Sequence, residues 1–158
     1  MKRLLVVSLL ALASLVFVPS ALSDPPTIQT FPIDATILDT ADCAFPVQID
    51  IAGTDLEITS ASGDRVFDAF PQSTATLTNL DTERSITVSI AGPGHTTFGA
   101  DGSFTLVGTG PTLFFFVPEL FPGITQFNGR FVITVDAEGN LTFSHVGETR
   151  DLCAELAG

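Results

Sequence analysis

The 158-residue chain contains no tryptophan and no tyrosine, and it has only two cysteines. Sugar-binding surfaces and many protein-binding hot spots depend on the amphipathic rings of tryptophan and tyrosine, so their absence counts against a carbohydrate substrate. The cysteines form no C-x-x-C pair, and neither stands beside a basic residue. A redox or nucleophilic cysteine needs such a setting, and the sequence therefore predicts none.

Basic residues are also scarce. Beyond residue 23 the only cations are Arg65, Arg84, Arg130 and Arg150, which face 18 acidic residues and leave a formal charge of −14. Nucleic acids and anionic membranes are bound through clustered lysine and arginine. We therefore expect neither partner, and the acidity suits solubility outside the cell.

Residues 1–23 have the pattern of a secretory signal peptide. Lys2 and Arg3 precede the apolar stretch Leu4–Val18, and Ala21-Leu22-Ser23 offers small residues for cleavage. As a helix the apolar stretch would span about 22 Å, which is shorter than the roughly 30 Å hydrocarbon core of a membrane. The sequence thus predicts a cleaved, secreted protein that does not stay inserted in a membrane.

The two cysteines fit that compartment. Cys43 and Cys153 are predicted to form a structural disulfide, which would close a loop of 110 residues. By chain entropy such a loop stabilises a domain by about 4–5 kcal/mol. We expect residues 24–42 to be an extended lead-in that lies across the sheet, and residues 43–158 to form a single domain.

Period-two alternation of apolar and polar residues dominates the predicted domain, and helical periodicity is nearly absent. Asp101-Gly102 and Glu138-Gly139 lie between alternating segments, as in tight hairpins. The pattern predicts an all-β fold, an antiparallel meander of eight or nine short strands, with a short helical turn within Glu148–Leu156. Barrel-like closure is favoured because it removes exposed strand edges. A two-layer, immunoglobulin-like sandwich is the alternative, but its buried tryptophan and inter-sheet cysteine pair are missing.

Four short motifs give the chain a resemblance to a known group. They are Cys43-Ala44-Phe45-Pro46-Val47, Thr76-Leu77-Thr78-Asn79, Gly108-Thr109-Gly110 and Asp151-Leu152-Cys153. In this order they resemble an uncharacterised family of small secreted β-proteins of actinobacteria, with one disulfide joining the two ends of the domain. The resemblance implies compartment and fold, and it carries no functional residue.

No motif predicts a metal or another cofactor. His95 and His145 lack the spacing of a zinc site. The acidic segment Asp136–Asn140 has its glycine and its acidic residues at the wrong positions for an EF-hand, and two strands flank it as they would a hairpin turn. Gly108-Thr109-Gly110 precedes a strand instead of the helix that a phosphate-binding loop requires, so we expect it to be a turn.

The segment Leu113–Pro122 is the most unusual part of the sequence. Its phenylalanines would point to both faces of a strand, which is typical of a strand covered by a second layer. The functional alternative is an exposed apolar tip or the wall of a hydrophobic cavity. The candidate binding residues are Phe114, Phe115, Phe116, Leu120 and Phe121.

Three function classes follow. The leading hypothesis is a non-enzymatic domain that binds a small apolar ligand or a protein partner through these residues. The second is an extracellular hydrolase or isomerase that uses carboxylates together with His145 and Arg130, which lie on adjacent predicted strands. The third is a structural protein of the cell envelope.

Overall fold

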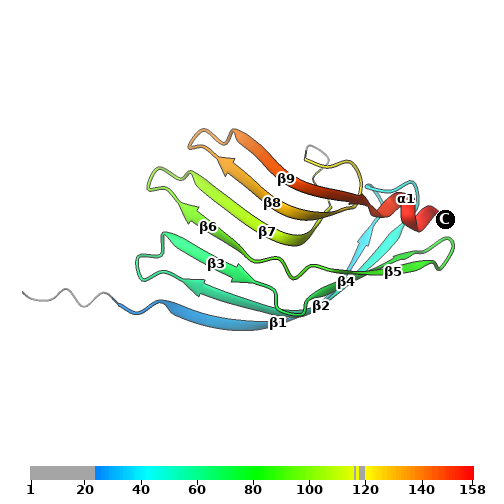
Figure 1. Ribbon diagram of the computed structural model, residues 1–158, viewed down its shortest axis with the longest axis horizontal. Helices are drawn as coiled ribbons and strands as arrows, with labels where there is room; N and C mark the ends of the chain where they lie inside the picture. The colour runs from blue at the N-terminus through cyan, green and yellow to red at the C-terminus, as the bar shows by residue number, and fades with distance from the viewer. Residues whose placement is uncertain (1–23, 116, 118–119) are drawn as a thin grey trace, which may run out of the picture.

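The computed structural model describes residues 24–115, 117 and 120–158. The predicted signal peptide and Phe116 lie outside the described residues. Nine strands and one helix follow one another along the described chain (Figure 1). They are β1 (Thr27–Asp39), β2 (Val47–Thr59), β3 (Arg65–Ala69), β4 (Thr74–Asn79), β5 (Ser85–Ser89), β6 (Gly94–Phe98), β7 (Phe104–Phe114), β8 (Thr125–Val135), β9 (Leu141–Asp151) and α1 (Leu152–Ala157). The described part contains no helix long and apolar enough to cross a membrane.

All nine strands belong to one antiparallel sheet that divides at β2. Strand β1 pairs with β2 along its whole length, so the remaining partners of β2 must share its other edge. On that edge β4 pairs with residues 47–52 of β2, and β3 pairs with residues 56–59. One branch of the sheet ends with β5, and the other continues through β6, β7 and β8 to β9.

The all-β prediction is confirmed, but the predicted barrel-like closure is wrong. Among the described residues β1 pairs only with β2, and β9 pairs only with β8. The first and last strands of a barrel must pair with each other, whereas here they form separate edges of one curved sheet (Figure 1). The predicted closure assumed an unbranched meander, in which each strand pairs with the next. The sheet instead divides at β2, so the order of the strands differs from a meander.

The segment expected to be an extended lead-in forms β1. It is hydrogen-bonded edge to edge with β2 and does not lie across the sheet. At the other end of the chain, β9 continues to Asp151, whose side chain accepts a hydrogen bond from the Ala154 backbone N–H and so caps α1. The predicted helical turn is therefore real but begins four residues later than Glu148.

One end of the sheet carries a compact core, which we call the packed end. Val47, Ile49 and Leu77 are fully buried on one face of β2 and β4. Leu152 and Leu156 of α1 cover them from above. The predicted Cys43–Cys153 disulfide is confirmed, and it ties α1 to the loop between β1 and β2. In Figure 1 this end lies at the right, around α1, β4 and β5.

Candidate functional site

Beyond the packed end, the same face of the sheet surrounds a hollow. Cross-strand partners share a face, so the register places Glu57, Asp68, Gly94, Gly108 and Phe131 in one row across β2, β3, β6, β7 and β8. Ile51, two residues beyond the buried Ile49, lies on this face as well. We call it the inner face.

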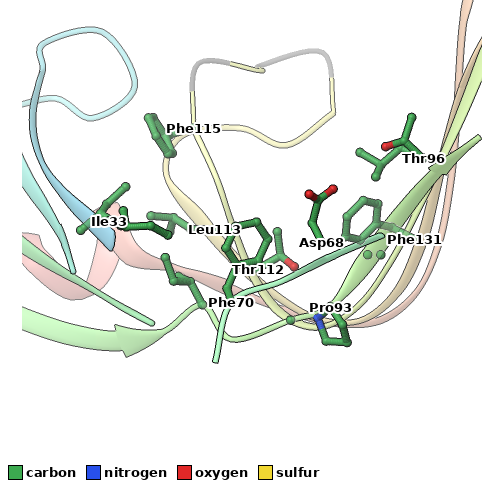
Figure 2. A pocket seen from close by; sticks show the side chains of 15 residues that line it. Ile33, Asp68, Phe70, Pro93, Thr96, Thr112, Leu113, Phe115 and Phe131 are labelled. Carbon is green, nitrogen blue, oxygen red and sulfur yellow. The ribbon is translucent and has the colours of Figure 1, made fainter. Parts of the chain in front are cut away.

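A cavity of about 480 Å³ lies on the inner face, a size typical of small-molecule sites. Its walls are mainly apolar and come from β1, β2, β3, β6, β7, β8 and the segments between them (Figure 2). The lining residues are Ile33, Ile51, Asp68, Phe70, Ile90, Gly92, Pro93, Gly94, Thr96, Leu106, Gly108, Thr112, Leu113, Phe115 and Phe131.

One glycine is essential to the shape of this wall. The ring of Phe131 lies directly over Gly108, its cross-strand neighbour, and a Cβ at residue 108 would overlap the ring. The ring of Phe131 therefore lies against β7 and forms part of the cavity wall. Gly108-Thr109-Gly110 is thus neither a phosphate-binding loop nor a turn between strands, because β7 runs through it without interruption.

Asp68 is the only ionisable side chain in the cavity lining. Figure 2 shows its carboxylate among the side chains that line the cavity. Burial raises the pKa of this carboxyl above its usual value, and the nearby Asp55 and Glu57 raise it further. Glu57 is its direct cross-strand partner.

A related effect occurs on β2. Burial, followed by repulsion from Glu57, raises the pKa of Asp55. Its Oδ1 atom is inaccessible to solvent and has no hydrogen-bond partner within the described part of the chain. Asp68 in the cavity wall and Asp55 and Glu57 on β2 therefore form a group of three carboxylates that repel one another.

The sequence analysis missed these acidic residues. In Val66-Phe67-Asp68-Ala69-Phe70, Asp68 alternates with its neighbours so that it shares a strand face with the apolar Val66 and Phe70. This alternation was the signal in the sequence. A carboxylate at an inward position of a strand is unusual because burying a charge is costly. The pairing of β3 with β2 was needed to place Asp68 beside Asp55 and Glu57.

The predicted phenylalanine segment is divided between two environments. Phe115 lines the cavity. Phe114 and Phe121 are buried with their ring centroids 4.8 Å apart, and they pack with Phe127, Phe131, Phe143 and the half-buried Leu120 on the inner face of β7, β8 and β9. Phe131 belongs to both environments, so this aromatic cluster forms the side of the cavity that adjoins β8.

The residues of the enzyme hypothesis do not converge. Arg130 of β8 is the cross-strand partner of Val146, and His145 of β9 is the partner of Phe131, the residue after Arg130. Adjacent strand positions point to opposite faces, so Arg130 and His145 lie on opposite sides of the sheet. His145 stacks on Phe143 with centroids 5.2 Å apart, and neither residue lines the cavity.

Within residues 24–115, 117 and 120–158 there is no group of three or more His, Cys, Asp or Glu side chains that could hold a metal ion. In the segment Asp136–Asn140, the Asp136 carboxylate accepts hydrogen bonds from the backbone N–H groups of Glu138 and Asn140. These bonds close the turn between β8 and β9, as the sequence indicated.

Comparison of the chain with protein-family models, with curated proteins and with solved structures finds no match. The resemblance to a family of actinobacterial secreted proteins therefore stays a prediction.

Proposed function

We propose that this chain is a secreted, non-enzymatic β-domain that binds a small apolar molecule in the cavity of its inner face. The observation that supports this most is the cavity itself, about 480 Å³ in volume and walled mainly by apolar side chains. Burial of apolar surface would supply the binding energy, at about 25 cal/mol per Å² before the cost of association is subtracted. The disulfide is compatible with an oxidising, extracellular setting.

A protein partner is the second candidate, since β1 leaves one edge of the sheet open over 13 residues. An open edge can accept a strand from another chain. However, Pro32 has no N–H to donate, and Asp34 adds a charge in the middle of this strand. Proline and charge are the devices by which proteins protect edges from pairing. The cavity is therefore the better candidate for the binding site.

The test uses the neutral dye N-phenyl-1-naphthylamine, whose emission rises in apolar surroundings. The wild type has no tryptophan or tyrosine, and the dye is excited at wavelengths that tryptophan does not absorb, so the tryptophan variants below add no emission either. Thr96 lines the cavity, whereas Thr97 lies on the other face of the same strand. Thr96→Trp would fill the cavity, and Thr97→Trp is the matched control.

We expect the wild type and Thr97→Trp to bind the dye with similar affinity, and Thr96→Trp to bind it about tenfold more weakly, the loss that corresponds to about 1.4 kcal/mol. Circular dichroism would show that both variants keep their strands. Absence of dye binding in the wild type, or equal binding by the two variants, would contradict a ligand site in this cavity.

A further inference from the structure

We propose that the ligand of this cavity is an amphiphile with a protonated amine, in which the ammonium group pairs with Asp68 and the apolar body fills the hollow. This inference rests on the proposed function, because it requires that the cavity be a ligand site. It adds the chemical class of the ligand: a primary or secondary alkylamine instead of a neutral lipid or a fatty acid.

The first argument is the isolation of Asp68. It is the only ionisable group in a wall that is otherwise apolar or uncharged. Within the described residues, no hydrogen bond and no ion pair reaches its carboxylate: the one ion pair there joins Arg150 to Glu155. An ionised carboxylate at a partly buried position is costly unless a cation or donor satisfies it.

The second argument is the charge around it. On β2, the strand beside β3, Glu57 stands directly opposite Asp68, and Asp55 lies on the same face. On the other side of β3, the cross-strand neighbour of Asp68 is Gly94, which brings no charge. Like charges at opposing positions of a sheet are destabilising. A cation in the hollow would relieve this repulsion.

The third argument is that the described chain supplies no such cation. The register places Arg65 opposite Thr97 and Arg130 opposite Val146, both on the outer face. Arg150 is held by Glu155, and Arg84 lies near the C-terminal Gly158, at the packed end. None of the described arginines faces Asp68, so in this proposal the ligand supplies the positive charge.

The fourth argument is the selectivity that follows. A carboxylate ligand would be repelled by Asp55, Glu57 and Asp68. A neutral alcohol would leave the Asp68 charge unpaired as the apolar body displaced water from it. An ammonium group would both neutralise the charge and donate hydrogen bonds, and charge-assisted bonds of this kind are the strong ones.

The experiment compares three probes that share one alkyl chain: decylamine, decanol and decanoate. Affinities are measured at neutral pH by displacement of N-phenyl-1-naphthylamine from the wild type, Asp68→Asn and Glu148→Gln. Glu148 is exposed and pairs with Asn128 on the outer face, so Glu148→Gln removes one negative charge without touching the cavity.

For the wild type we expect decylamine to bind about tenfold or more tightly than decanol, and decanoate to bind most weakly. Asp68→Asn should lose about tenfold in decylamine affinity while its decanol affinity changes less than about twofold. Glu148→Gln should behave as the wild type does. That result would show a local pairing at Asp68 and not an effect of the net charge.

Two outcomes would overturn the inference while leaving the proposed function in place: equal binding of decylamine and decanol, or a preference for decylamine that persists in Asp68→Asn. If the dye binds the wild type and none of the three probes displaces it, the inference fails alone. If the dye itself does not bind the wild type, the proposed function fails, and the inference fails with it.

Discussion

The two ends of the inner face differ although they belong to the same sheet. At the packed end, α1 and Ile124 cover β2, β4 and β5, and side chains such as Ile49 and Leu77 have no solvent exposure. At the other end, which we call the open end, no helix of the described residues covers β3 and β6, and the cavity lies there instead. The contrast places the solid core and the cavity in different parts of one continuous surface.

The covering elements explain why the packed end is solid. Asn79, at the end of β4, donates a side-chain hydrogen bond to the Leu156 carbonyl and so fixes the end of α1. The disulfide fixes the first turn of the same helix. The open end has no comparable clamp, and its inner face carries Asp68 where the packed end carries leucine and isoleucine.

The largest expected effect comes from removing the disulfide. In the double variant Cys43→Ala/Cys153→Ala, the loop of 110 residues is no longer closed in the unfolded chain. We expect the free energy of unfolding to fall by about 4–5 kcal/mol. Urea denaturation followed by far-UV circular dichroism would measure it, with the untreated wild type as reference. A loss below about 1 kcal/mol would mean that the other contacts of α1 suffice to hold the packed end.

The next comparison sets one leucine from each end side by side. Leu77→Ala removes a fully buried side chain from the packed end and leaves a void, so we expect a cost of about 3 kcal/mol. Leu106→Ala enlarges a cavity that already exists, and its half-buried side chain has less contact to lose. We expect about 1 kcal/mol there. Equal costs in urea denaturation would show that the cavity wall is as tightly packed as the core.

Much of the fold could be predicted from local patterns. The errors lie where the structure depends on which strands pair with each other. The hairpin at Asp101-Gly102 and the disulfide were both evident in the sequence. The Gly108-Thr109-Gly110 step looked like a break between strands, but β7 continues through it because Phe131 of the next strand covers Gly108. No local signal could show that cover.

The candidate site was predicted only in part for the same reason. Phe115 was identified from its apolar segment, and it lines the cavity. Phe114 and Phe121 were identified by the same argument, yet they are buried in the aromatic cluster next to it. All three residues are apolar, so composition alone could not distinguish the residue in the cavity wall from the two that are buried in the aromatic cluster. Asp68 was missed because its significance depends on Glu57, a residue on another strand.

The smallest expected effect is a change in stability on replacing Asp50 or Asp68 by asparagine. The two replacements are expected to change the stability in opposite directions. On the outer face of β2, Asp50 accepts hydrogen bonds from the Thr36 hydroxyl at 2.6 Å and the Gln48 side-chain amide at 2.8 Å, and these bonds lower its pKa. A lowered pKa means that the folded state favours the charged form. This stability is present above the pKa of the unfolded chain and is lost as the pH falls through the folded pKa.

Asp68 has the reverse linkage. Burial and the two neighbouring carboxylates raise its pKa, so the folded state favours the protonated form, and that stability is lost as the pH rises through the folded pKa. We therefore expect Asp68→Asn to raise the urea midpoint at neutral pH and to have little effect at about pH 3, below the usual pKa of an aspartate. Asp50→Asn should lower the midpoint at neutral pH, and its cost should shrink on acidification. If Asp68→Asn lowers the midpoint at neutral pH, as Asp50→Asn is expected to do, the carboxylate at the open end is not under strain, and a cationic ligand would have no unpaired charge to satisfy.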